Sequence, residues 1–140
     1  MPLTLDQANQ IIAAAFKQAR GAGVKPLAIA VIDAHGNQKS VQRDDGASMF
    51  RIDVAIGKAW AAVGMGAASR VLAERAKGNP NFFVALAATG QGKFLPQTGA
   101  VLIKDAQGNV LGAAGASGGT GEEDEAACMH GIEAAGLKHA

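Results

Sequence analysis

The sequence contains no tyrosine and only one cysteine, Cys128. A single cysteine excludes an intrachain disulfide and any zinc site that uses several thiolates. The aromatic side chains are limited to five phenylalanines and one tryptophan, too few for the stacking platforms that bind single-stranded nucleic acid. We therefore expect no disulfide framework and no nucleic-acid partner.

An excess of charge of either sign is also missing, because 13 basic and 12 acidic side chains give a net charge of +1. This balance offers no electrostatic attraction to nucleic acid or to an anionic membrane surface. No apolar run approaches the roughly 18 residues that a membrane span needs. The first residues read as the start of a helix instead of the basic and then apolar stretch of a signal peptide. We expect a cytoplasmic protein with no membrane partner.

Glycine and alanine, in contrast, are abundant. Glycine accounts for 19 of 140 residues, about twice the average share of roughly 7%. With 49% hydrophobic and 18% charged residues, the composition is that of a globular chain, and its length suits a single domain over residues 1–140. Because small side chains fill little volume per residue, we expect the chain to gain stability by packing into a homo-oligomer.

Two capping boxes mark the first and the last helix. Thr4 and Gln7 have the spacing that begins a helix. Gly21, or the glycine two residues later, ends that helix. Thr120 and Glu123 repeat the pattern near the end of the chain, and acidic residues crowd the first turn there, where the helix dipole favours them.

Two further helices are predicted in the middle of the chain. Ser48 is placed to cap the first of them. Its predicted inner stripe is formed by Ile52, Ile56, Ala59 and Val63. The second spans residues 69–77 and is closed by Gly78. Residues 82–88 fit either a strand or a helix, and we favour an extended segment.

Four short apolar or alternating runs predict two β-hairpins. They cover residues 27–32, 38–43, 100–104 and 110–116. The strings DAHGN (33–37) and DAQGN (105–109) separate the members of each pair. Both strings keep an aspartate for a side-chain turn bond and a glycine for positive φ. Local hairpins with helices grouped between them favour an α+β fold with an antiparallel sheet.

The two repeated strings are better interpreted as turns than as a duplicated metal loop. Their middle positions differ, with His35 in one and Gln107 in the other, whereas a duplicated metal loop should keep its ligand. The other ends of the same strands then lie together at the opposite edge of the sheet. Arg43 and Asp45 leave the first hairpin there and Ser117 leaves the second, so we predict the functional site at that edge.

Three features near this edge suit an anionic ligand. The loop from Ser117 to Thr120 follows a strand and opens a helix, so its amides suit a carboxylate, although a tight structural turn explains the same pattern. Arg43 is placed either to grip a carboxylate in a two-pronged contact or to pair with a neighbouring aspartate. Lys58 lies in the apolar string AIGKAWAA, where it either snorkels to solvent or serves an inner site.

No complete catalytic motif is present. No serine lies in a G-x-S-x-G elbow, and the three histidines do not make a metal set. Cys128 lies among alanines and is expected to be a buried, inert thiol. We therefore favour a binding protein over an enzyme, with Lys58 and Asp45 as the candidates for acid–base groups.

The ordered set of motifs resembles the GlcG/HbpS family, which also forms the C-terminal domain of PduO-type proteins. The similar strings are LTLDQANQIIAAA, IAVIDAHGN, RDDGA, DVAIGKAWAA and VLGAAGASGGTGEEDEAA, and together they span nearly everything from Leu3 to Leu137. The resemblance implies a profilin-like fold, a five-stranded antiparallel sheet flanked by helices, usually in symmetric oligomers. It also implies haem binding and, for some members, haem degradation or iron handling.

These observations predict a protein that binds a small ligand, with haem or a related tetrapyrrole as the first candidate. The alternative is an enzyme or accessory subunit that acts on a small carboxylate metabolite. The predicted ligand-binding residues are Arg43, Asp45, Lys58, Ser117, Gly118, Gly119 and Thr120. His130, in the last helix, is the predicted ligand of the haem iron.

Overall fold

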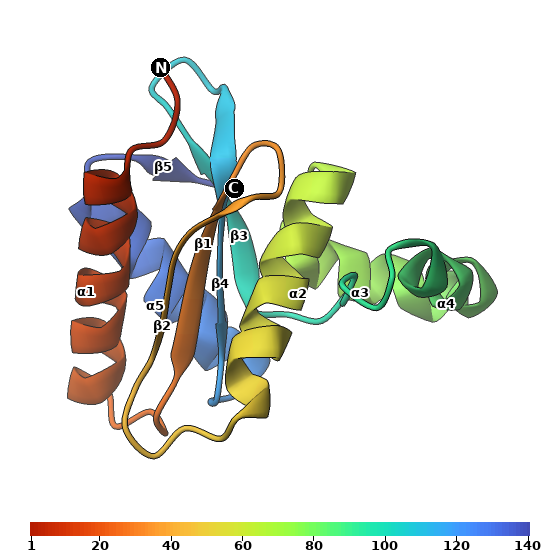
Figure 1. The fold of residues 1–140 in the computed structure, drawn as a ribbon, viewed down its shortest axis with the longest axis horizontal. Helices are drawn as coiled ribbons and strands as arrows, with labels where there is room; N and C mark the ends of the chain where they lie inside the picture. Colours follow the sequence, from red (N-terminus) through yellow and green to blue (C-terminus); the bar gives the residue numbers. More distant parts are fainter.

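The computed structural model describes residues 1–140 and contains a five-stranded sheet between helices (Figure 1). The strands are β1 (Ala28–Asp33), β2 (Gln38–Arg43), β3 (Ala100–Lys104), β4 (Val110–Ser117) and β5 (Lys138–His139). They lie in the order β2-β1-β4-β3-β5, and every neighbouring pair is antiparallel. The predicted α+β class and profilin-like sheet are confirmed.

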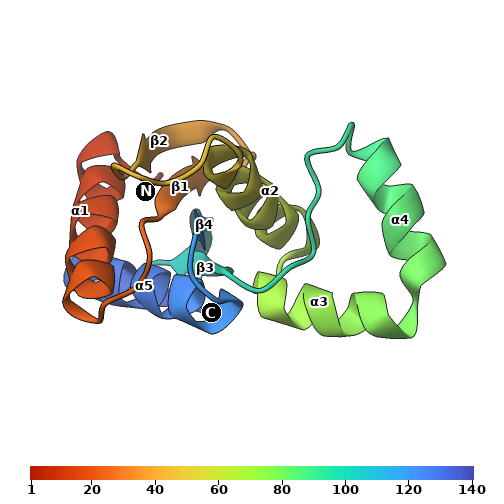
Figure 2. The ribbon, with the colours of Figure 1, turned by 90° about the horizontal axis from the view of Figure 1, so that it is seen from below.

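Helices cover both faces of this sheet. They are α1 (Leu5–Gly21), α2 (Phe50–Met65), α3 (Ser69–Gly78), α4 (Pro80–Thr89) and α5 (Gly121–Ala134). Helices α1 and α5 lie side by side on one face, and α2 lies on the other (Figures 1 and 2). Helices α3 and α4 extend away from the sheet beyond α2, and the chain returns along α2 to β3 (Figure 2). No helix combines the length and the hydropathy that crossing a bilayer requires.

The alternation of residues along β1 assigns its side chains to the two faces. Ile29 and Val31 are fully buried in the larger core, which α1 and α5 complete. Ala28 and Ala30 point to the opposite face, where they pack against Ala55 of α2. Because the side chains on this second face are small, α2 can lie close to the sheet.

The close approach of α2 explains why its inner stripe differs from the predicted one. An added Cβ on Gly115 of β4 would overlap the carbonyl oxygen of Ala55 and lie 3.1 Å from the backbone nitrogen of Ala59. Only small residues fit there, so Ala55, Ala59 and Ala62 of α2 are fully buried. The prediction was right for Ala59 and wrong for the larger members. Ile52, Ile56 and Val63 are only partly buried.

The two predicted capping boxes are confirmed, and the predicted Ser48 cap is wrong. The hydroxyls of Thr4 and Thr120 each accept a hydrogen bond from the backbone nitrogen three residues later, at 3.0 and 3.1 Å. No side chain caps α2. The Ser48 hydroxyl instead accepts a hydrogen bond from Nε of Arg51 at 3.2 Å. Its oxygen therefore bonds a charged side chain and not a backbone amide of the first turn.

The extended segment predicted for residues 82–88 is also wrong, because these residues belong to α4. Pro80 occupies the start of the helix, where its missing N–H costs nothing. Phe83 packs in a small cluster with Leu72 and Phe94, the two phenylalanine rings having centroids 6.0 Å apart. Periodicity does not separate a short apolar run in a helix from one in a strand, so these contacts with neighbouring segments decide.

The repeated strings form hairpin turns, as predicted. Asp33 and Asp105 each use Oδ1 to accept hydrogen bonds from the backbone amides two and four residues later, at 2.9 to 3.0 Å. Gly36 and Gly108 both have a φ of +84°, which favours glycine. The two turns are therefore the same structural device used twice in one sheet.

Candidate functional site

The exits of the two hairpins lie at the same edge of the sheet, as the topology predicted. Ala28 of β1 is paired with Arg43 of β2 on one side and with Ser117 of β4 on the other. The turns at Asp33 and Asp105 lie at the opposite ends of these strands. The molecule thus has an exit end and a turn end, and each carries cavities.

A buried ion pair joins α2 to α5 at the exit end. Nζ of Lys58 donates hydrogen bonds to the Ala116 carbonyl at 2.9 Å and to Oδ2 of Asp124 at 3.1 Å. Lys58 is 5% exposed and Asp124 is 1% exposed. The pKa of the Asp124 carboxyl lies above its ordinary value, because the cost of burying the charge exceeds the lowering by the Lys58 charge and the Gly119 amide. Of the two predicted possibilities for Lys58, the structure shows an inner position and not a snorkelling one.

The backbone amides of the glycine-rich loop donate hydrogen bonds to carboxylates of the same chain. The Gly119 amide donates to Oδ1 of Asp124 at 3.0 Å, and the Thr120 amide donates to Oε1 of Glu123 at 2.9 Å. Both acceptors belong to the first turn of α5. This geometry is that of a tight strand-to-helix turn, which was the alternative to an anion-binding loop.

Three of the predicted ligand-binding residues, Lys58, Ser117 and Gly119, line one cavity of about 380 Å³ at the exit end. Arg51 joins them, with Nη1 donating to the Ser117 hydroxyl at 3.1 Å. Apart from Val54, the lining is polar or glycine. The sequence signal for Arg51 was its spacing of seven residues from Lys58, which places both on one face of α2.

The other predicted residues lie around this cavity without lining it. Arg43 is exposed, and its Nη1 donates to the Ala47 carbonyl at 2.6 Å. Asp45 is also exposed. Gly118 and Thr120 line a separate neighbouring cavity of about 320 Å³. The ligand-binding and acid–base roles of these residues stay predictions.

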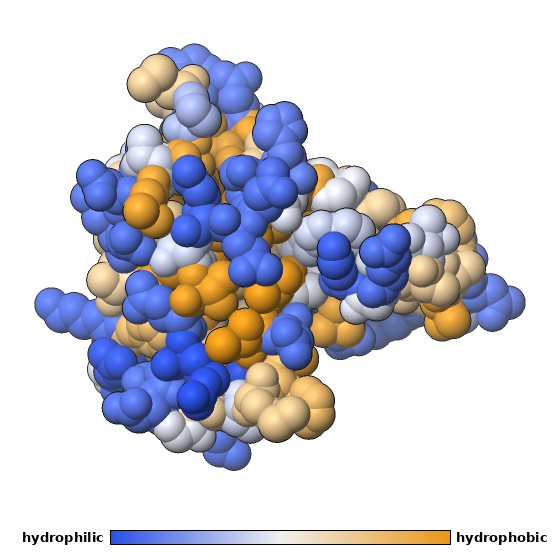
Figure 3. Space-filling view, in the orientation of Figure 1, coloured by the Kyte–Doolittle hydropathy of each residue, from blue (hydrophilic) through white to orange (hydrophobic).

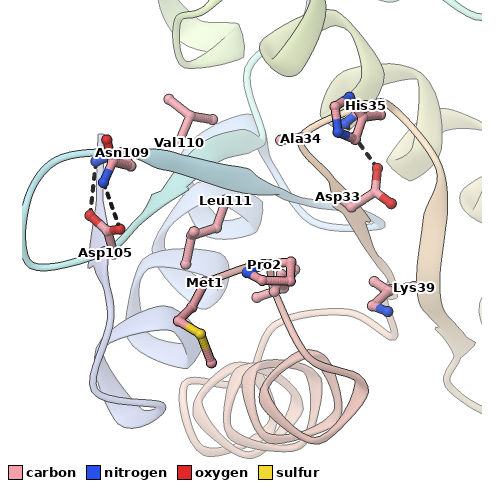
Figure 4. Close-up of a pocket in the computed structure, with 11 residues that line it drawn as sticks. Met1, Pro2, Asp33, Ala34, His35, Lys39, Asp105, Asn109, Val110 and Leu111 are labelled. Carbon is pink, nitrogen blue, oxygen red and sulfur yellow. Dashed lines mark hydrogen bonds between the residues drawn. The ribbon is translucent and has the colours of Figure 1, made fainter.

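The turn end carries a cavity of about 330 Å³ between the two repeated turns and the start of the chain (Figure 4). Leu111 and Pro2 supply apolar surface, and Asp33 and Asp105 supply carboxylates. The side chain and the backbone amide of Asn109 donate to Asp105 and hold the pKa of its carboxyl below the ordinary value. Lys39 and the N-terminal residue Met1 also line this cavity, named the turn cavity below, so charged groups of both signs surround it.

A further cavity, of about 240 Å³, lies between the first turn and α2. It is lined by Ala34, His35, Gly36, Trp60, Val63 and Gly64. No carboxylate is among these residues, and the indole ring is the largest surface. We call this space the indole cavity.

The cysteine and the other two histidines lie elsewhere. Cys128 is fully buried, and burial raises the pKa of its thiol far above the ordinary value, so the predicted inert thiol is confirmed. His130 is exposed on α5. Nε2 of His139 lies 2.7 Å from Oε1 of Glu133.

The comparisons with known proteins agree with this architecture. Residues 3–133 match the protein family described as haem degrading protein HbpS-like. The chain belongs to this family. The resemblance noted from the sequence motifs is thereby confirmed. A comparison with curated protein sequences gave no match.

Several solved structures share the fold over nearly the whole chain. A crystal structure of a PduOC–haem complex has a TM-score of 0.86 at 27% sequence identity, covering 98% of this chain and 97% of that one. The Klebsiella pneumoniae protein ORFY has a TM-score of 0.86 at 27% identity, covering 96% and 90%. HbpS has a TM-score of 0.82 at 28% identity, covering 95% and 89%.

Proposed function

We propose that this protein binds haem or a related tetrapyrrole and takes part in haem or iron handling. The observation that carries the proposal is the match in fold, over almost the full length of both chains, to a domain whose crystal structure is a haem complex. Membership of the HbpS-like family supports it. The alternative, an enzyme for a small carboxylate metabolite, has no comparable support.

The residues present in this chain fit a tetrapyrrole. Haem requires a donor atom for the iron and an apolar surface for the macrocycle. The imidazole ring of His35 makes no hydrogen bond or ion pair within the chain, and His35 lines the indole cavity. Lys58 is less suited to the predicted contact with a haem carboxylate, because Asp124 and the Ala116 carbonyl already occupy its ammonium group.

Titration of the purified chain with ferric hemin tests this function. We expect a saturable shift of the Soret band with a stoichiometry of one haem for each binding site, because a protein donor replaces a solvent ligand on the iron. The urea-unfolded chain serves as the control for non-specific haem uptake. A linear, unsaturable rise in absorbance, equal for folded and unfolded chain, would contradict the proposal.

We also propose that the protein is a homo-oligomer. Large apolar side chains remain exposed in the isolated chain, with Phe50 at 62%, Phe82 at 50% and Val84 at 72%. Phe82 and Val84 lie on α4, in the part that extends from the sheet (Figure 2). Apolar side chains also reach the surface on the face that β2 and α2 form (Figure 3). Packing against a second copy would remove this surface from water.

The mass in solution tests this assembly. We expect light scattering to give at least twice the mass of one chain, and the double variant Phe82→Glu/Val84→Glu to reduce that mass, because charged side chains resist burial in an interface. Ala126→Glu, which adds a charge at an exposed position of α5, is the matched control. A wild-type chain that is monomeric at tens of micromolar would show the assembly proposal to be wrong.

A further inference from the structure

We propose that His35 is the axial ligand of the haem iron and that the macrocycle lies in the indole cavity, against Trp60. This assignment rests on the haem-binding function proposed above and names the site. It also replaces two expectations from the sequence, which discounted His35 as a turn residue and placed the iron on His130.

Among the three histidines, His35 is the one whose ring is both free and beside an apolar cavity. Nε2 of His139 is occupied by Glu133 at 2.7 Å. His130 is exposed on α5, a helix that covers the opposite face of the sheet from α2 (Figure 1). The hydrogen bond that His35 makes to Asp33 uses only its backbone amide, at 2.9 Å. Its ring nitrogens remain available to a metal ion.

Two glycines hold the Trp60 indole in a fixed position beside His35. A Cβ on Gly36 would lie 3.1 Å from Nε1 of Trp60, and a Cβ on Gly90 would lie 2.9 Å from Cζ3. The ring is therefore enclosed by backbone on two sides. Such an arrangement gives a flat, rigid apolar wall against which a planar ligand can stack.

The space extends beyond the indole cavity. An adjoining cavity of about 410 Å³ shares Gly36 and Trp60 with it and is also lined by Ile56, Asp53 and Lys93. Together the two cavities fall within the roughly 300–1,000 Å³ of pockets that bind small ligands. Lys93 makes no ion pair with any carboxylate of the chain, so its ammonium group can pair with a carboxylate of the ligand.

The lining of the indole cavity differs from that of the turn cavity, which His35 also borders. The turn cavity is lined by Asp33, Asp105 and Lys39 together with the N-terminal residue of the chain. These charged groups would lose hydration beneath a macrocycle. The indole cavity has no lysine, arginine or carboxylate among its lining residues, and the nearest such groups, Asp53 and Lys93, line the adjoining cavity. The geometry thus favours the indole side of His35.

Spectra of reconstituted variants of the full chain test the ligand. We expect His35→Ala to bind ferric hemin roughly tenfold more weakly or worse, with a Soret band displaced from that of the wild type. Free imidazole should restore the position of that band by replacing the missing ligand. If His35 only stabilised the fold, free imidazole would not restore it. His130→Ala, the matched control, should bind hemin and absorb as the wild type does.

A second pair of variants tests the side on which the macrocycle lies. Val63→Glu places a carboxylate in the indole cavity and should weaken hemin binding, whereas Val110→Glu places one in the turn cavity and should not. Circular dichroism and thermal unfolding establish that each variant is folded. A His35→Ala spectrum equal to that of the wild type, or weakened binding in Val110→Glu but not in Val63→Glu, would overturn the assignment while the haem-binding function stands. A wild-type chain that fails to bind hemin would overturn both.

Discussion

Asp124→Asn should lower the free energy of unfolding by about 3–5 kcal/mol, because it leaves the Lys58 ammonium buried without a counter-charge. The amide keeps the shape of the carboxyl and an oxygen for the Gly119 amide, but its NH2 group then faces Nζ of Lys58, so the change removes both the negative charge and the acceptor of the Lys58 hydrogen bond. Lys58 is 5% exposed and has no other anionic partner within the chain. Urea unfolding followed by linear extrapolation measures the loss.

Two controls identify the broken buried pair as the cause. The double variant Lys58→Met/Asp124→Asn should recover most of the loss, since neutral groups replace both members of the buried pair. Glu74→Gln removes one member of the exposed pair with Lys77, whose atoms are 2.9 Å apart, and should change stability by less than about 0.5 kcal/mol. Equal effects for Asp124→Asn and Glu74→Gln would show that the buried pair contributes no more than a surface pair does.

This buried pair shows where reasoning from the sequence succeeded and where it stopped. The apolar string around Lys58 indicated an unusual lysine, and the sequence also showed that acidic residues crowd the first turn of α5. Neither pattern gave the partner, because Lys58 and Asp124 are 66 residues apart and meet only through the packing of α2 and β4. Local sequence patterns predict helix caps and turns well, but they do not predict which residues pair across long stretches of the chain.

The fold was predictable wherever a local rule dictates the structure. The capping boxes at Thr4 and Thr120 and the two Asp–Gly turns have defined side-chain bonds, and all are present. Errors fell where tertiary contacts decide. The run 82–88 became a helix through packing of Phe83, and the inner stripe of α2 was set by the approach of Gly115.

The same distinction applies to the candidate site. Pairing of Ala28 with both Arg43 and Ser117 followed from the order of the strands, so the meeting of the two exits was predictable. The neighbourhood of His35 was not, because Trp60 lies in a different element and comes to the first turn only when α2 packs on the sheet. A histidine in a turn looks inert until the surface beside it is known.

Gly131→Ala should destabilise the protein by about 3 kcal/mol, although alanine is the better helix former. Gly131 lies on α5 where this helix meets α1, and an added Cβ would overlap the carbonyl oxygen of Ile11 and lie 3.2 Å from Cβ of Ala15. Backbone atoms cannot move aside as a flexible side chain can. The two helices would have to separate, and the core around Ile12 and Ile132 would lose contacts.

Gly64→Ala is the matched control, because this glycine also lies within a helix, α2, but has no atom within 4 Å of the position of an added Cβ. Alanine reduces the conformational freedom of the unfolded chain, so Gly64→Ala should raise the free energy of unfolding by up to about 1 kcal/mol. The same chemical change is thus expected to have opposite signs at Gly131 and Gly64, as measured by chemical unfolding of both variants. Stabilisation in both would mean that α1 and α5 can separate at little cost. Close packing of the two helices would then not require glycine at position 131. The abundance of glycine in this chain would need no explanation by helix packing.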